Sequence, residues 1–244
     1  MLLYARSLLF NTLMYVLMLV MGVVLAPLAL VSRDGAYWSI KVYTRLILWL
    51  LKVLCGLRVE VRGEVPQVEV VVASKQQSFL DILILANRLP RPKFIMKKEL
   101  KWAPILGFYA MRIGCAPVDR GKKARAMNDM VSAIDSNAQA DHDPGQIIIY
   151  PQGTRVPVGK VVPYKVGAAV LYRQFGVPCV PAATNAGVYW GRFEIPRRPG
   201  VAVLEFLEPI PVGVAQREFM KVMEERIETG SDALLDEIGH PSRG

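Results

Sequence analysis

Histidine is scarce in this sequence of 244 residues, where it occurs only at His142 and His240. Cysteine is nearly as scarce, and Cys55, Cys115 and Cys179 are far apart and form no Cys-x-x-Cys pair. This spacing excludes a disulfide framework and a metal site, and it favours a reducing compartment. The 17 prolines and 19 glycines follow no repeat, which excludes collagen-like and solenoid folds.

Charge is absent from residues 7–32, a run in which Leu, Val, Met and Ala dominate. The run exceeds the roughly 20 residues that a helix needs to cross a bilayer. In the following stretch, 38–57, Lys41, Arg45 and Lys52 are spaced to share one helical face, as in a basic amphipathic helix at the headgroups. The sequence leaves three arrangements open. The first helix spans the membrane, both helices dip into one leaflet, or the two helices form a buried pair in a soluble fold. The cations favour the cytoplasmic side for everything downstream.

Basic residues outnumber acidic ones by 30 to 21, which gives a formal net charge of +9. Between Arg88 and Arg125, eleven basic residues are opposed only by Glu99 and Asp119. Such a region attracts phosphate, an acidic carrier protein or an anionic membrane surface. Because no helix-turn-helix, zinc-finger or RNA-recognition signature accompanies the charge, we do not expect nucleic acid as a partner.

After Gly56 short β-branched runs alternate with helical stretches, which predicts an α/β domain with a mostly parallel central sheet flanked by helices. The expected strands are 57–62, 68–73, 93–96, 115–118, 146–150, 177–182 and 201–206. The expected helices are 79–87, 122–138, 166–175 and 214–228, with an irregular helical stretch broken at Pro104 and Gly107. We therefore divide the chain into N-terminal membrane-anchoring helices (1–56), an α/β domain (57–230) and a loose C-terminal tail (231–244).

Three polar segments follow or close predicted strands, so they can converge on one edge of the sheet, where sites form in such folds. They are 74–81 (SKQQSFLD), 114–120 (GCAPVDR) and 150–155 (YPQGTR). Arginine offers a bidentate fork to phosphate oxygens, and glycine lets the backbone approach closely. The two arginines and the Gly-Thr turn therefore predict a site for an anionic ligand, with phosphate as the first candidate.

The order and spacing of these segments resemble the glycerolipid acyltransferase family, and most closely its bacterial 1-acyl-sn-glycerol-3-phosphate acyltransferases. The family has His-x4-Asp after a central strand, a segment ending in Asp-Arg, a Phe-Pro-Glu-Gly-Thr-Arg segment and a later Val-Pro-x-x-Pro strand, which is 177–181 here. The resemblance covers roughly residues 35–215. It implies acyl transfer from acyl-CoA or acyl-carrier protein to the free hydroxyl of 1-acylglycerol-3-phosphate, giving phosphatidate. It also implies that no metal or cofactor takes part, and that the catalytic domain lies on the cytoplasmic face of a bacterial inner membrane.

The same resemblance assigns the site residues. The catalytic pair corresponds to Gln76 and Asp81. The substrate's phosphate is expected at Arg120, Gln152, Gly153, Thr154 and Arg155, and further contacts with substrate or carrier are expected at Lys75, Lys97 and Pro181. The sequence leaves the oligomeric state open.

Gln76 departs from the family where the chemistry is most demanding. In family members a histidine at this place takes the proton from the acceptor hydroxyl, and the aspartate orients its imidazole. A carboxamide accepts a hydrogen bond but cannot hold that proton. Neither His142 nor His240 is an evident substitute, so we expect a disabled or weakened enzyme. Gln152, where the family often has Glu, is interpreted as a subfamily variant.

Two other functions fit the same residues. One is an acyltransferase for another lysolipid such as lyso-ornithine lipid, whose lack of phosphate leaves Arg120 and Arg155 less well explained. The other is a non-catalytic phospholipid-binding protein on the same fold, for which Gln76→His would restore no activity.

Overall fold

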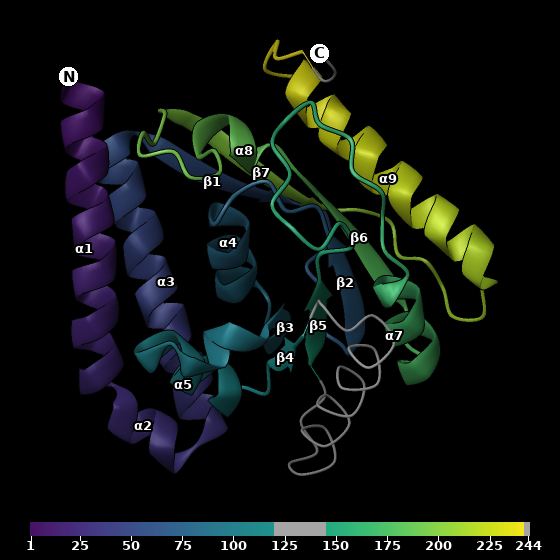
Figure 1. Cartoon of the computed structure of the whole chain (residues 1–244), viewed down its shortest axis with the longest axis horizontal. Helices are drawn as coiled ribbons and strands as arrows, with labels where there is room; N and C mark the ends of the chain where they lie inside the picture. The colour runs from purple at the N-terminus through teal and green to yellow at the C-terminus, as the bar shows by residue number, and fades with distance from the viewer. Residues whose placement is uncertain (120–144, 242–244) are drawn as a thin grey trace.

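A seven-stranded sheet forms the centre of the protein (Figure 1), and the computed structural model describes residues 1–119 and 145–241. The strand order is β1-β7-β6-β2-β5-β3-β4, and every neighbouring pair is parallel except β6 and β7. The strands are β1 (Leu57–Arg62), β2 (Val70–Ser74), β3 (Pro92–Lys97), β4 (Ala116–Val118), β5 (Gln146–Ile149), β6 (Cys179–Thr184) and β7 (Gly200–Phe206). The predicted mostly parallel α/β architecture is confirmed.

Helices cover both faces of this sheet (Figure 1). One face carries α1 (Leu2–Val24), α2 (Ala26–Val31), α3 (Arg33–Cys55), α4 (Leu80–Arg88), the 3₁₀ helix η1 (Lys98–Trp102), α5 (Pro104–Arg112) and the short α8 (Ala186–Tyr189). The other face carries α7 (Gly167–Phe175) and α9 (Gln216–Asp236). The helix expected at 122–138 lies outside the described residues, as do Arg120 and His142.

Two predicted features are wrong. Gly107 does not break a helix, because α5 runs through it. Glycine is needed here because a Cβ at this position would stand only 2.3 Å from the carbonyl oxygen of Lys101. The tail is not loose from residue 231, because α9 continues to Asp236 and buries Ser231, Leu234 and Leu235. The glycine at 230 suggested a stop, but it packs closely against Ala183 of β6.

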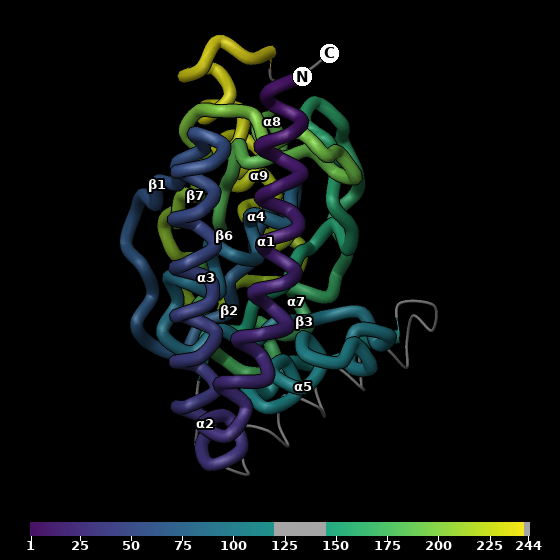
Figure 2. Tube along the Cα trace, turned by 90° about the vertical axis from the view of Figure 1, so that its left-hand side faces the viewer, coloured from purple at the N-terminus to yellow at the C-terminus, as the bar shows by residue number. Residues whose placement is uncertain are grey.

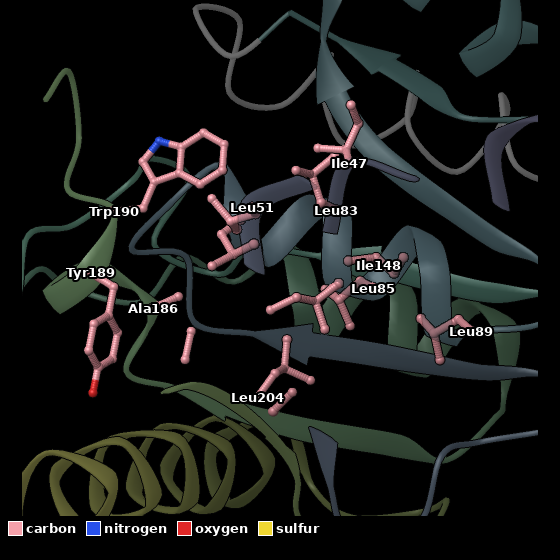
Figure 3. Packing of buried hydrophobic residues seen from close by; sticks show 14 of the residues in the cluster. Ile47, Leu51, Leu83, Leu85, Leu89, Ile148, Ala186, Tyr189, Trp190 and Leu204 are labelled. Carbon is pink, nitrogen blue, oxygen red and sulfur yellow. The ribbon is translucent and has the colours of Figure 1, made fainter. Parts of the chain in front are cut away.

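The N-terminal helices belong to the same hydrophobic core as the sheet. Phe10 and Met14 of α1 share one buried cluster with Ile47 and Leu51 of α3 and with side chains of α4, β2 and β5. Figure 3 shows Ile47 and Leu51 beside Leu83 of α4. Most exposed side chains of α1 are apolar, with Arg6 as the one charged residue of this helix, and α1 is long and apolar enough to cross a membrane. Figure 2 shows α1 and α3 side by side along one face of the molecule, so this face is a candidate membrane surface.

Arg197 joins α1 to the loop that follows α8. Its backbone N–H donates to the hydroxyl of Ser7 at 2.8 Å, and its guanidinium donates to Oδ1 of Asn11 at 2.9 Å. The guanidinium also stacks 3.9 Å from the ring centroid of Trp190, and the Trp190 ring meets Phe10 edge to face at 5.7 Å. Helix α1 is therefore anchored to the α/β body by polar contacts as well as by burial.

We expect Phe10→Ala to lower the free energy of unfolding by about 3–5 kcal/mol, because it leaves a cavity beside Trp190. Leu9→Ala is the matched control, since Leu9 is exposed on the same helix, and it should change stability by no more than about 0.5 kcal/mol. Denaturant unfolding in detergent measures both. Equal effects of the two substitutions would contradict the packing of α1 on the body.

Candidate active site

Asp81 is the centre of the segment that links β2 to α4. One carboxylate oxygen accepts the backbone N–H groups of Gln77 and Ser78, each at 2.8 Å. The other oxygen accepts the hydroxyl of Thr184 at 2.9 Å. Asp81 is completely buried. The segment between Gln76 and Asp81 is thus wrapped around its own carboxylate, and Thr184 ties that carboxylate to the end of β6.

Burial raises the pKa of Asp81 to about 6, from an ordinary value of 3.8. The hydrogen bonds from Ser78, Gln77 and Thr184 oppose this rise, as does the positive charge of Arg155, but they do not cancel it. Asp81 therefore titrates close to neutral pH, in the range where carboxyl groups take part in proton transfer.

Gln76 precedes this carboxylate and is 8% exposed. Its carbonyl oxygen accepts the backbone N–H of Val156 at 2.8 Å, which joins the segment after β2 to the segment after β5. Within the described residues no hydrogen bond links the Gln76 side chain to Asp81. The carboxylate thus fixes the backbone next to position 76, but it does not contact the Gln76 side chain through a hydrogen bond.

The segment after β5 forms a tight turn suited to an anion. Gly153 has a left-handed φ of 70°, and its N–H donates to the carbonyl of Tyr150 at 2.8 Å. A Cβ at Gly153 would stand 2.8 Å from the ammonium nitrogen of Lys165, so that cation lies over the turn. Gln152 is buried, and its Oε1 has no partner among the described residues. Thr154 is half-buried in the same turn.

A second arginine, which the sequence did not indicate, lies beside Arg155. Arg192 donates from Nη1 to the carbonyl of Arg155 at 3.2 Å. The guanidinium carbons of Arg155 and Arg192 are 5.4 Å and 4.7 Å from the ring centroid of Phe193. Burial first, and the charge of Arg192 second, lower the pKa of Arg155. Neither arginine forms an ion pair in the part of the chain that is described, so their charge is available to a ligand.

The structure separates the three residues for which substrate or carrier contact was expected. Lys75 is buried, and its ammonium pairs with Glu228 of α9 at 2.7 Å, so it does not face a carrier. Pro181 is buried within β6, which also removes it from any surface. Lys97 is exposed at the end of β3. Of the three, Lys97 alone keeps a side chain that an incoming partner could meet.

Glu228 also accepts the hydroxyl of Tyr164 at 2.7 Å. Lys75 precedes Gln76, and Tyr164 closes the segment that begins at the Gly153 turn, so one carboxylate of α9 supports both segments of the site. Sequence reasoning missed this residue, because nothing around it distinguishes it from the other acidic residues of an amphipathic helix.

An apolar cavity of about 150 Å³ lies among α1, α3, α4 and α5. Phe79 and Ile82, which flank Asp81 in the sequence, line it together with Met18 of α1 and Ile105 of α5. Among the described residues that line it, none is charged, and the polar groups are the hydroxyls of Ser39, Tyr43, Thr44 and Tyr109 and the thiol of Cys115. The cavity has the size and the apolar lining to hold a stretch of methylene groups.

We expect Asp81 to titrate with a midpoint near pH 6, measured from the carboxyl ¹³C shift of labelled protein. Thr184→Val removes a hydrogen bond to the charged form and should raise the midpoint further. Because the folded pKa lies above the unfolded one, the stability that Asp81 contributes is present at acid pH and is lost as pH rises through about 6. Asp81→Asn, the control, should abolish this pH-dependent step. A midpoint near 4 would contradict the buried environment.

Comparison with known proteins finds one enzyme family. The family model described as "Acyltransferase" matches residues 57–185. A 1-acyl-sn-glycerol-3-phosphate acyltransferase of Pseudomonas aeruginosa is 29% identical over 160 residues, which are 65% of this chain and 61% of that protein. This match therefore spans less than two thirds of that relative. The human 1-acyl-sn-glycerol-3-phosphate acyltransferase alpha is 30% identical over 205 residues, 82% of this chain and 71% of that protein.

The fold has a solved counterpart. The crystal structure of the 1-acyl-sn-glycerophosphate (LPA) acyltransferase PlsC from Thermotoga maritima matches with a TM-score of 0.77 and 21% identity. The match covers 94% of this chain and 95% of that one, so it includes the N-terminal helices as well as the sheet.

Proposed function

The chain belongs to the acyltransferase family, and we propose that it is a 1-acyl-sn-glycerol-3-phosphate acyltransferase weakened at its general base. The substrates are lysophosphatidate and an acyl thioester, either acyl-CoA or acyl-carrier protein, and the product is phosphatidate. One observation carries this proposal: the loop around Asp81 lies between an apolar cavity and a turn whose arginines form no ion pair within the described residues. A lysolipid has the same three parts, a hydroxyl between a phosphate and an acyl chain.

The reaction requires little besides positioning and a proton acceptor. The acceptor hydroxyl oxygen attacks the thioester carbonyl, an ester bond forms, the carbon–sulfur bond breaks, and the proton of the hydroxyl ends on the leaving thiolate. With a histidine at position 76 the imidazole would carry this proton, whereas Gln76 can only accept a hydrogen bond from the hydroxyl. Arg155, Arg192 and the Gly153 turn hold the phosphate, while the cavity beside Phe79 receives apolar chain. The proposed step uses neither a metal nor a cofactor.

Membrane association follows from the same geometry. The outer face of α1 is apolar, and the cations of α3 come after it in the chain. We place the catalytic domain on the cytoplasmic face of a bacterial inner membrane, because positive residues that flank a membrane helix stay on that side. The lipid acceptor then reaches the cavity from the bilayer.

We expect Gln76→His to increase phosphatidate formation by about 10²–10⁴-fold, because an imidazole takes the proton that the carboxamide cannot hold. The assay supplies lysophosphatidate with acyl-CoA and with acyl-carrier protein in separate reactions. Gln76→Asn is the matched control, which changes the side chain without adding a base and should gain nothing. Asp81→Asn in the Gln76→His protein should remove the gain, since the carboxylate orients the imidazole.

Two outcomes would contradict the proposed function in different ways. If the unaltered chain is as fast as the Gln76→His protein, another group acts as base and the account of Gln76 is wrong. If the Gln76→His protein binds lysophosphatidate but stays inert with both donors, the chain is a phospholipid-binding protein on an acyltransferase fold.

Two neighbouring guanidiniums favour a phosphate monoester over acceptors with less charge. A monoester carries about −1.5 to −2 at pH 7, whereas a phosphodiester carries a single charge and lyso-ornithine lipid has no phosphate. We expect Arg192→Gln to weaken the binding of lysophosphatidate about tenfold and that of lysophosphatidylglycerol less, so that the preference shrinks. Arg217→Gln, an exposed cation at the start of α9, is the charge-matched control. Calorimetry in detergent measures both ligands, and an unchanged preference would exclude Arg192 from the phosphate site.

A further inference from the structure

A second cleft, of about 380 Å³, opens between α3, the end of α4 and β1. Four basic residues line it, and no acidic residue does. The lining consists of Arg45, Leu48, Trp49, Lys52, Arg58, Val59, Asn87 and Arg88. None of these residues takes part in the site around Asp81. Arg88 lies at the far end of α4 from Asp81, roughly 10 Å along the helix axis.

The four cations of this cleft have no counter-charge in the described part of the chain. The acidic residues of α3 and β1 have other partners: Glu60 pairs with Arg62 at 2.6 Å, and Asp34 pairs with Arg91 at 2.6 Å. Like charges held around one concavity repel each other. An anion bound between them would remove that repulsion and would be attracted by all four.

Lys41 fixes the shape of this cleft without lining it. It was expected on the same face as Arg45 and Lys52, but its ammonium turns inward and donates to the carbonyls of Asn87 and Leu89, at 3.0 and 2.5 Å. Asn87 in turn donates from Nδ2 to the hydroxyl of Thr44 at 3.1 Å. These bonds lock the end of α4 onto α3, which holds Arg88 opposite the two cations of α3. The cleft is therefore built by the fold, not by mobile surface side chains alone.

The position of the cleft indicates the source of the anion. Helix α3 runs beside α1, whose outer face is apolar, and β1 lies on the other side of α3 (Figure 2). Trp49 is 56% exposed on α3, and an indole is typical of the level where lipid headgroups meet the acyl chains. Leu48 and Val59 add apolar surface between the cations. A lipid headgroup offers the matching pair, a phosphate joined to a short apolar stem.

We propose that this cleft binds the headgroup of an anionic phospholipid, separately from the acyl acceptor. The guanidiniums of Arg58 and Arg88 bind the phosphate, Arg45 and Lys52 add positive charge from α3, and Trp49 packs against the glycerol and the first methylenes. An acidic protein fits less well, since a stable protein interface takes about 20–30 residues from each partner, whereas eight residues line this cleft.

In the test, the full-length chain in a non-ionic detergent is titrated with short-chain phosphatidylglycerol, and calorimetry measures the binding affinity. All proteins also carry Arg155→Gln/Arg192→Gln, which removes both guanidiniums from the acceptor's phosphate site, so the measured binding reports on the second cleft. The double variant Arg58→Gln/Arg88→Gln should bind the lipid at least about tenfold more weakly than the parent protein. The double variant Arg58→Lys/Arg88→Lys keeps both charges and should retain most of the parent's affinity. Arg217→Gln/Lys221→Gln, a matched loss of two exposed cations on α9, should stay within about twofold.

Several results would overturn the proposal. Equal binding of short-chain phosphatidylcholine would exclude recognition of an anionic headgroup, and equally tight binding of inorganic phosphate would make this a free-phosphate site. Binding of acyl-carrier protein that Arg58→Gln/Arg88→Gln abolishes, with lipid binding unchanged, would assign the cleft to a protein. If the Arg58→Gln/Arg88→Gln protein keeps its lipid affinity and its unfolding temperature, the lipid binds outside this cleft. None of these results bears on the Gln76→His assay.

Discussion

The buried carboxylate of Asp81 is the constraint on which the rest of the site depends. It is shielded from water, and three hydrogen bonds from Gln77, Ser78 and Thr184 satisfy it. A charge in such a place is costly unless it is hydrogen-bonded, and here the donors come from the loop itself and from β6. The carboxylate therefore sets the path of the backbone at Gln76 whether or not a base occupies that position. The segment between β2 and α4 therefore keeps its shape without any contribution from the side chain of Gln76.

The membrane-facing helices are held by the same body that forms the site. Phe10 packs on Trp190, and Arg197 reaches from the loop after α8 to Asn11 of α1. The apolar cavity exists because α1 and α3 close over α4 and α5. Packing of α1 and α3 on the body and formation of the apolar cavity are consequently one structural event, and a change in the packing of α1 reaches the cavity directly.

Positive charge is divided between two places with different surroundings. Arg155 and Arg192 flank Phe193 beside the Gly153 turn, close to the buried carboxylate. The cleft of Arg58 and Arg88 lies at the opposite end of α4 and faces the flank of the membrane helices. We assign the first place to the ligand that reacts and the second to a ligand that only binds. The overall charge of +9 does not reveal this division.

The sequence alone determined the parallel α/β framework, the apolar first helix and the segments around Asp81 and Gly153, because strand alternation, apolar periodicity and strand-end motifs are local signals. The contacts that complete the site were decided by tertiary structure. Arg192, Thr184 and Glu228 lie far along the chain from the segments they contact, and no local pattern distinguishes them from other polar residues. The same holds for Lys41, which shares its helical face with Arg45 and Lys52 but turns inward to α4. Which cation stays free for a ligand depends on which carbonyl or carboxylate lies within reach, and that is a property of packing between elements.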